Sequence, residues 1–190
     1  MPRIILLKQR ARCEALAVLV YTLAFCHTAA AGSAEESGDI LRVAVPTAAW
    51  ALTFHYDDPQ GRRDFYQSFA ANIVATYALK QVVDKKRIDG SDDDAFPSGH
   101  ASTAFQGAAF LHRRYGIRRA WWAYALAAYT GWTRIDADEH DAADVLGGAA
   151  VGIASSFLLT QSREQSVVWV PEIGPNYVGL RFSLNPGTRR

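Results

Sequence analysis

The stretch Ala95-Phe96-Pro97-Ser98-Gly99-His100-Ala101-Ser102-Thr103 is typical of the beginning of an apolar helix. Its proline fixes the chain direction, and its glycine allows the backbone to approach a ligand closely. The first N–H groups of a helix point outward with the positive end of the dipole behind them, so such a turn suits an anion. A histidine in the first turn lies close enough to exchange a proton with that anion. Taken alone, the stretch is better explained by an ordinary capped helix with a surface histidine.

Charged residues flank this stretch in two further blocks. Upstream, Lys80 and Arg87 lie on or just beyond the end of a predicted helix, where a lysine also has a capping role. Downstream, Arg134 is followed by His140 and Asp144. On one helix, that histidine and aspartate would share a face one turn apart, so the carboxylate would fix the imidazole tautomer and leave the second nitrogen as a nucleophile. The alternative is an exposed pair of the kind common at this spacing.

Together the three blocks resemble the type 2 phosphatidic acid phosphatase superfamily, which also contains bacterial class A acid phosphatases and vanadium haloperoxidases. The resemblance covers residues 41–160, with its specific matches between Lys80 and Asp144. It implies that His140 attacks phosphorus and becomes a phosphohistidine, that Asp144 orients His140, and that His100 protonates the leaving oxygen and then activates water. The phosphoryl oxygens would be bound, without any metal or other cofactor, by Lys80, Arg87, Ser98, Gly99 and Arg134. Ile88 and Thr133 stand where this family usually has proline and serine. Ile88 puts the assignment of Arg87 in question, because Lys85 and Lys86 are close by.

The implied function is metal-independent hydrolysis of phosphomonoester or diphosphate groups. The family suggests lipid substrates such as phosphatidic acid, isoprenyl diphosphate or a lipid A phosphate, although a small phosphoester also fits. One alternative is a vanadium-dependent haloperoxidase with the same pocket, which the short domain disfavours. Another is a catalytically silent envelope protein that binds phosphate. The intact nucleophile pair and His100 count against that reading, because a pure binder needs only the cations.

Hydrophobic periodicity, together with the family resemblance, predicts an all-α fold, a compact bundle of about five helices with a short C-terminal β-hairpin. The helical patterns span residues 62–86, 101–112, 118–132 and 141–160, and an apolar segment at 41–55 is interrupted by Pro46. Gly116 is predicted to end a helix, and Gly148 and Gly152 to let a neighbouring helix approach closely. The helical phosphatase domain is assigned to residues 41–160, and residues 161–190 form a tail that carries the alternating hairpin pattern.

Residues 1–31 combine four basic residues, an apolar run and an Ala-Ala-Ala end, a pattern that predicts an export signal peptide, with an uncleaved membrane anchor as the alternative. The small and polar residues 32–40 are predicted to be a mobile N-terminus of the mature chain. Both cysteines lie in the signal, so cysteine nucleophiles, disulfides and cysteine metal sites are excluded from the mature chain. The remaining 16 basic and 18 acidic residues give no indication of nucleic-acid binding.

We therefore expect an exported protein of the periplasm or cell envelope, and association with the inner membrane is one of its expected forms. The mean hydropathy of −0.06 favours a soluble or membrane-surface helical domain over one that is mostly transmembrane. The aromatic segment 121–124 fits contact with a membrane surface and fits buried packing equally well.

Overall fold

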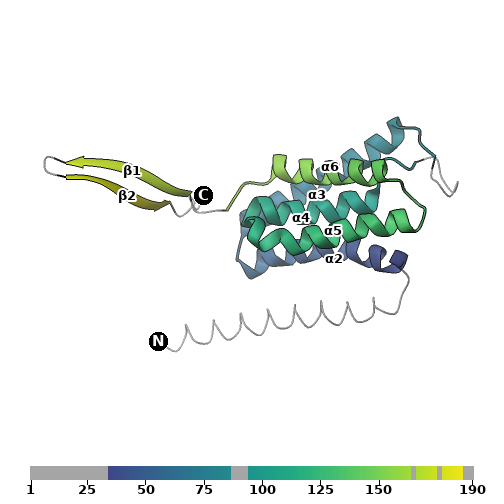
Figure 1. Ribbon diagram of the computed structural model, residues 1–190, viewed down its shortest axis with the longest axis horizontal. Coiled ribbons are helices and arrows are strands. Elements are labelled where there is room, and N and C mark those ends of the chain that lie inside the picture. Colours follow the sequence, from purple (N-terminus) through teal and green to yellow (C-terminus); the bar gives the residue numbers. More distant parts are fainter. Residues whose placement is uncertain (1–33, 87–93, 164–165, 175–176, 186–190) are drawn as a thin grey trace, which may run out of the picture.

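The computed structural model describes residues 34–86, 94–163, 166–174 and 177–185. Figure 1 shows its helices side by side in a bundle. They are α2 (Ala34–His55), α3 (Pro59–Val82), α4 (Gly99–Tyr115), α5 (Ile117–Asp136) and α6 (Ala142–Leu159). The prediction of an all-α bundle is confirmed for this part of the chain, whereas the predicted signal peptide lies outside the described residues.

Helix α4 is the centre of the bundle, because it contacts each of the other four described helices. Its buried positions are mostly small, so its neighbours pack close to its backbone. A Cβ at Gly107 would lie 2.7 Å from Pro46 Cα of α2, and a Cβ at Gly152 of α6 would lie 2.3 Å from Ser102 O. These overlaps show why glycine is required at both contacts. The close approach predicted from the glycines of α6 is confirmed, and the neighbour is α4.

Helix α2 corrects the prediction that residues 32–40 form a mobile terminus, because a regular helix begins at Ala34 and continues through Pro46 to His55. Tertiary contacts hold its first turns: Ser37 and Gly38 are buried, and Ser37 Oγ lies 3.1 Å from Tyr129 Oη of α5. Short polar residues look mobile when judged locally, but here they pack against another helix. The first turns of α2 therefore belong to the folded bundle.

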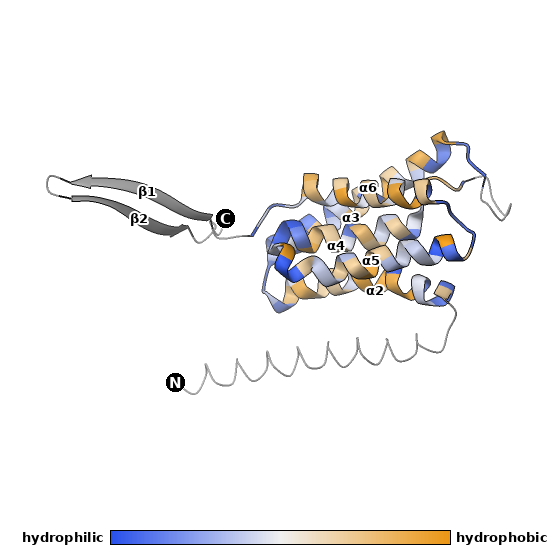
Figure 2. Cartoon of the chain, viewed as in Figure 1, coloured by the Kyte–Doolittle hydropathy of each residue, from blue (hydrophilic) through white to orange (hydrophobic). Residues whose placement is uncertain are grey.

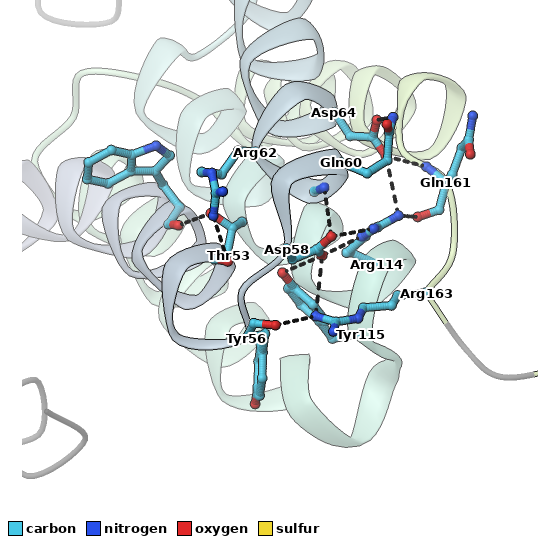
Figure 3. A network of polar contacts seen from close by, with 12 residues as sticks. Thr53, Tyr56, Asp58, Gln60, Arg62, Asp64, Arg114, Tyr115, Gln161 and Arg163 are labelled. Atoms are coloured by element: carbon cyan, nitrogen blue, oxygen red, sulfur yellow. Dashed lines mark hydrogen bonds and ion pairs between the residues drawn. The ribbon is translucent and has the colours of Figure 1, made fainter. Parts of the chain in front are cut away.

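A buried polar network closes the end of the bundle where α4 ends (Figure 3). Asp58 caps α3 by accepting from Gly61 N–H at 3.0 Å, and it receives Arg114 Nη2 at 2.6 Å and Nε at 2.8 Å. Tyr115 Oη also donates to Asp58, at 3.0 Å. Burial alone would raise the pKa of the Asp58 carboxyl, but these hydrogen bonds and the arginine charge lower it to about 2. Arg114 Nη1 donates to Gln161 O at 2.8 Å, which ties the chain beyond α6 to the bundle.

Gly116, with φ of 87°, separates α4 from α5, as predicted for a helix stop. After α6 the chain forms β1 (Ser166–Gly174) and β2 (Tyr177–Asn185), paired antiparallel with Ser166 opposite Asn185. Residues 175–176, which join the two strands, and the side chains of both strands lie outside the described part of the chain, so the predicted C-terminal hairpin is not confirmed and stays a prediction.

Among the described residues, α6 is the one helix whose length and apolar composition would suffice to cross a membrane. A core helix of a soluble protein meets the same criterion. Hydrophobic segments occur along every helix of the bundle (Figure 2).

Candidate active site

The first turn of α4, the end of α5 and the start of α6 bring most of the predicted site residues to one end of the bundle. His140 N–H donates to Arg134 O at 3.1 Å, so the loop after α5 folds back onto that helix. Ser98 N–H donates to Asp144 O at 3.0 Å, which joins the entrance of α4 to that of α6. Ala95 N–H donates to Lys85 O at 2.8 Å and brings the chain after α3 alongside. Backbone hydrogen bonds thus connect the three sequence blocks.

His140 and Asp144 are neighbours, but not on one helix as predicted. Helix α6 begins at Ala142 with Asp141 as its N-cap, so His140 lies in the preceding loop. The side chains nevertheless meet, with His140 Nδ1 3.6 Å from Asp144 Oδ2. That separation is longer than a hydrogen bond. Both side chains are almost completely buried, with 2% and 1% of their surfaces exposed.

Asp144 is held by two residues that the sequence reasoning did not assign to the site. Lys85 Nζ contacts Asp144 Oδ1 at 2.7 Å and Asp141 Oδ2 at 2.6 Å. Asp141 and Asp144 also form a reciprocal capping box, in which each side chain accepts from the other's N–H. Burial lowers the pKa of Lys85, but the two carboxylates outweigh it and raise the pKa. A local signal for the cap existed, since aspartate is a favoured N-cap residue. Lys85 is 59 residues from Asp144, beyond the reach of any local pattern.

Ser98 and Gly99 form the entrance of α4 in a way that suits anion binding. A Cβ at Gly148 of α6 would lie 2.3 Å from Ser98 O, so α6 fixes this turn by close packing. Ser98 Oγ is buried and makes no hydrogen bond among the described residues. A Cβ at Gly99, by contrast, would meet no atom within 4 Å. The turn is therefore held from one side and leaves space in front of Gly99.

His100, the second residue of α4, contacts Asp39 of α2, with Nε2 2.6 Å from Asp39 Oδ1. Burial is the main cause that lowers the pKa of His100 to about 4. The charges of Arg134 and Arg42 act in the same direction, against the hydrogen bond that His100 makes to the Asp39 carboxylate. Burial would raise the pKa of Asp39, but His100 and these two arginines lower it. At neutral pH a neutral His100 therefore faces an ionised Asp39.

Arg134 is the most deeply buried cation of this group, with 1% of its side chain exposed. Its Nη2 donates to Glu35 O at 2.6 Å, and its Nη1 lies 3.4 Å from Asp39 Oδ1 and 3.4 Å from Glu139 Oε1. Carboxylates and a main-chain carbonyl thus surround the guanidinium. Neither Glu35 nor Asp39 was among the predicted site residues, because their segment was expected to be mobile.

Of the two cations of the first block, the structure describes Lys80 but not Arg87. Lys80 donates to Asp94 O and forms an ion pair with Asp94 Oδ2 at 3.4 Å. Its contacts therefore lie with the residue that precedes the α4 entrance stretch. Arg87 lies outside the described residues. Within the part of the chain that the structure describes, no three histidine, cysteine or acidic side chains gather in a metal-binding group.

Comparison with known proteins gives a family for this arrangement. Residues 14–167 match the profile of the PAP2 superfamily. A lipid A 1-phosphatase of Porphyromonas gingivalis is 47% identical over 70 residues, which are 35% of this chain and 16% of that protein. A lipid A 4'-phosphatase of Helicobacter pylori is 28% identical over 158 residues, which are 76% of this chain and 79% of the relative.

A lipid A 1-phosphatase of Helicobacter pylori is 37% identical over 68 residues, which are 36% of each chain. The chain thus matches about a sixth of the length of the Porphyromonas protein and about a third of the length of the Helicobacter lipid A 1-phosphatase. No solved structure matches the chain.

Proposed function

The chain belongs to the PAP2 superfamily, and from that membership we propose that it is a phosphatase acting on a phosphorylated lipid. The family match confirms the resemblance found in the three sequence blocks. The observation that carries the proposal is the contact between His140 Nδ1 and Asp144 Oδ2, which lie 3.6 Å apart and belong to almost completely buried side chains. Backbone bonds link the pair to Arg134 and to the Ser98–Gly99 turn. A nucleophile, a carboxylate to orient it, a cation and an anion-binding turn are the parts that phosphoryl transfer requires.

In the proposed reaction, His140 attacks phosphorus with the ring nitrogen that does not face Asp144. The P–O bond to the leaving group breaks, and His100 gives that oxygen its proton. His100 then removes a proton from water, which attacks the phosphohistidine and releases inorganic phosphate and free His140. Because the pKa of His100 is about 4 in the unliganded protein, His100 must gain its proton when the substrate's negative charge enters.

The phosphoryl oxygens would be bound by Arg134, by Ser98 Oγ and by the N–H of Gly99. The buried Ser98 hydroxyl and the open space at Gly99 support this assignment. Lys80 and Arg87 are proposed to complete the set of donors. Loss of one such donor costs about 2–4 kcal/mol in the activation barrier.

A lipid A phosphate is the substrate that the relatives favour, since all three reported relatives are named as lipid A phosphatases. Phosphatidic acid and isoprenyl diphosphate remain candidates of the same chemical class. The outer surface of the bundle supports a lipid substrate, because large apolar side chains are exposed on several helices. Examples are Tyr66 and Val74 of α3, Trp121 and Trp132 of α5, and Leu146 and Leu158 of α6. We propose that this surface contacts the membrane of the cell envelope.

Phosphate release from lipid micelles tests the proposal. Lipid A, phosphatidic acid and isoprenyl diphosphate are incubated with the full chain in the presence of a chelator, and inorganic phosphate is measured. We expect release that survives the chelator and disappears in His140→Ala. His55→Ala is the matched control, because His55 is an exposed histidine at the other end of α2 from Asp39. Equal release by the unmutated chain and His140→Ala, or no release from any of the three lipids, would refute the proposal.

A further inference from the structure

The carboxylate of Asp39 occupies the space between the two groups that the proposed reaction assigns to the phosphoryl group. Oδ1 lies 2.6 Å from His100 Nε2 of α4 and 3.4 Å from Arg134 Nη1 of α5. Nε2 is the ring nitrogen farther from the backbone, and it is the natural donor to a leaving oxygen. One oxygen of Asp39 therefore takes the contacts that a phosphate oxygen would make.

The first turns of α2 are built to hold the carboxylate there. Arg134 Nη2 donates to Glu35 O at 2.6 Å, and a Cβ at Gly38 would lie 2.8 Å from the same nitrogen and 2.0 Å from Thr133 Oγ1. Only glycine allows α2 to lie so close to the end of α5. The residue after it, Asp39, is thereby brought onto the guanidinium. A phosphate cannot reach Arg134 from this side without displacing that carboxylate.

Asp39 is much more exposed to solvent than its two partners. Its side chain is 49% exposed, whereas those of His100 and Arg134 are 15% and 1% exposed. Asp39 thus lies at the solvent side of the buried pair, where a change of its side-chain rotamer would uncover His100 Nε2 and remove one of the two carboxylates from Arg134 Nη1. The other carboxylate on Arg134, that of Glu139, lies 3.4 Å away and is only 18% exposed. Asp39 is therefore the carboxylate that bridges both groups from the solvent side.

We propose that Asp39 competes with phosphate for this site: its carboxylate binds His100 and Arg134 until a phosphoryl group displaces it, and returns when the product leaves. The inference rests on the proposed function and adds a residue to it. Displacement lowers the affinity for any phosphate by the same amount, so free phosphate and small esters bind weakly. A lipid substrate retains useful affinity because its apolar chains add binding energy away from the reacting group.

The experiment measures binding of inorganic phosphate to the full chain by calorimetry, with Asp39→Asn and Asp39→Ala. We expect both variants to bind phosphate about tenfold more tightly, because a competing anion and its repulsion are removed. Asp136→Asn is the matched control, since it removes the charge of an exposed aspartate on α5, and its phosphate affinity should stay within twofold of the unmutated value. Melting temperatures are measured in parallel, and two different replacements at an exposed position guard against a folding defect.

Kinetics with a small soluble ester, p-nitrophenyl phosphate, give a second reading. Competition predicts a lower KM and stronger product inhibition in both Asp39 variants. A residue that only positions His100 would instead lower kcat and leave phosphate affinity unchanged, and this result would overturn the inference. Phosphate release from lipids by the unmutated chain, without tighter phosphate binding in either folded variant, overturns the inference alone. No phosphate binding by any variant, together with no phosphate release, overturns the proposed function as well.

Discussion

Replacement of Arg114 by methionine is predicted to destabilise the bundle strongly, without touching the candidate active site. Arg114 and Asp58 join through two hydrogen bonds of 2.6 and 2.8 Å, and their side chains are 7% and 5% exposed. Methionine keeps most of the aliphatic volume but removes the guanidinium. The change leaves the buried carboxylate with the more distant and more exposed Arg163, whose Nη1 lies 3.7 Å from Asp58 Oδ2, and it also removes the hydrogen bond from Arg114 Nη1 to Gln161 O.

The expected loss in the free energy of unfolding is about 3–5 kcal/mol, the usual cost of removing one partner from a buried ion pair. A chain of this size loses about 2–4 °C in Tm for each kcal/mol, so Arg114→Met should melt about 6–20 °C lower. Asp58 keeps its hydrogen bonds from Gly61 and Tyr115. These bonds place the expected value toward the lower part of the range.

Thermal unfolding followed by circular dichroism at pH 7 measures this loss, with all variants in the same detergent. Arg113→Met is the matched control, because Arg113 is the preceding residue, is exposed and donates from Nε to Thr160 O at 3.1 Å. Its replacement should cost about 1 kcal/mol or less, the usual net value of a single hydrogen bond. If the two variants melt at the same temperature, or if Arg114→Met melts within about 2 °C of the unmutated chain, the buried network does not stabilise the fold as argued.

Three further predictions concern the same contacts. The pKa of Asp58 falls from its usual 3.8 to about 2 on folding, so its carboxylate contributes about 2 kcal/mol to the free energy of unfolding. This contribution is complete above about pH 5 and is lost as the pH falls from 4 to 2. Urea unfolding at pH 7 and pH 3 measures the difference. Lys85→Gln should lower kcat about tenfold with a smaller effect on KM, since Asp144 loses the cation that holds Oδ1, and unchanged kcat would show that this ion pair does not position it. Gly148→Ala should destabilise the chain by about 1–3 kcal/mol, because its Cβ would lie 2.3 Å from Ser98 O, and a melting temperature equal to the unmutated one would contradict that overlap.

The helices α3 to α6 could be predicted from the sequence because their apolar periodicity is a local property. Predicted and observed ends differ by a few residues: the pattern over 118–132 became Ile117–Asp136, for example. The first turns of α2 could not be predicted in this way. They contain short polar residues, and what orders them is contact with α5 through Ser37 and Gly38.

Contacts between site residues that are close in sequence could be predicted, whereas contacts between residues far apart in sequence could not. The spacing of His140 and Asp144 predicted a contact, although a capped loop and not a shared helix produces it. Asp39 is 61 residues from His100, and Lys85 is 59 residues from Asp144, so only packing brings these pairs together. The roles proposed for all these residues stay predictions until they are measured.

Trapping of the phosphorylated enzyme tests the central claim most directly. The full chain is mixed with a lipid substrate labelled in its phosphate, quenched in alkaline detergent within one turnover, digested and mapped by mass spectrometry. The account predicts phosphate on His140, formed and lost at least as fast as turnover, and no such label in His140→Ala. With a substrate whose leaving group needs no proton, the phosphohistidine should accumulate in His100→Ala. Phosphate release by a chain that never carries label on His140 would contradict the account.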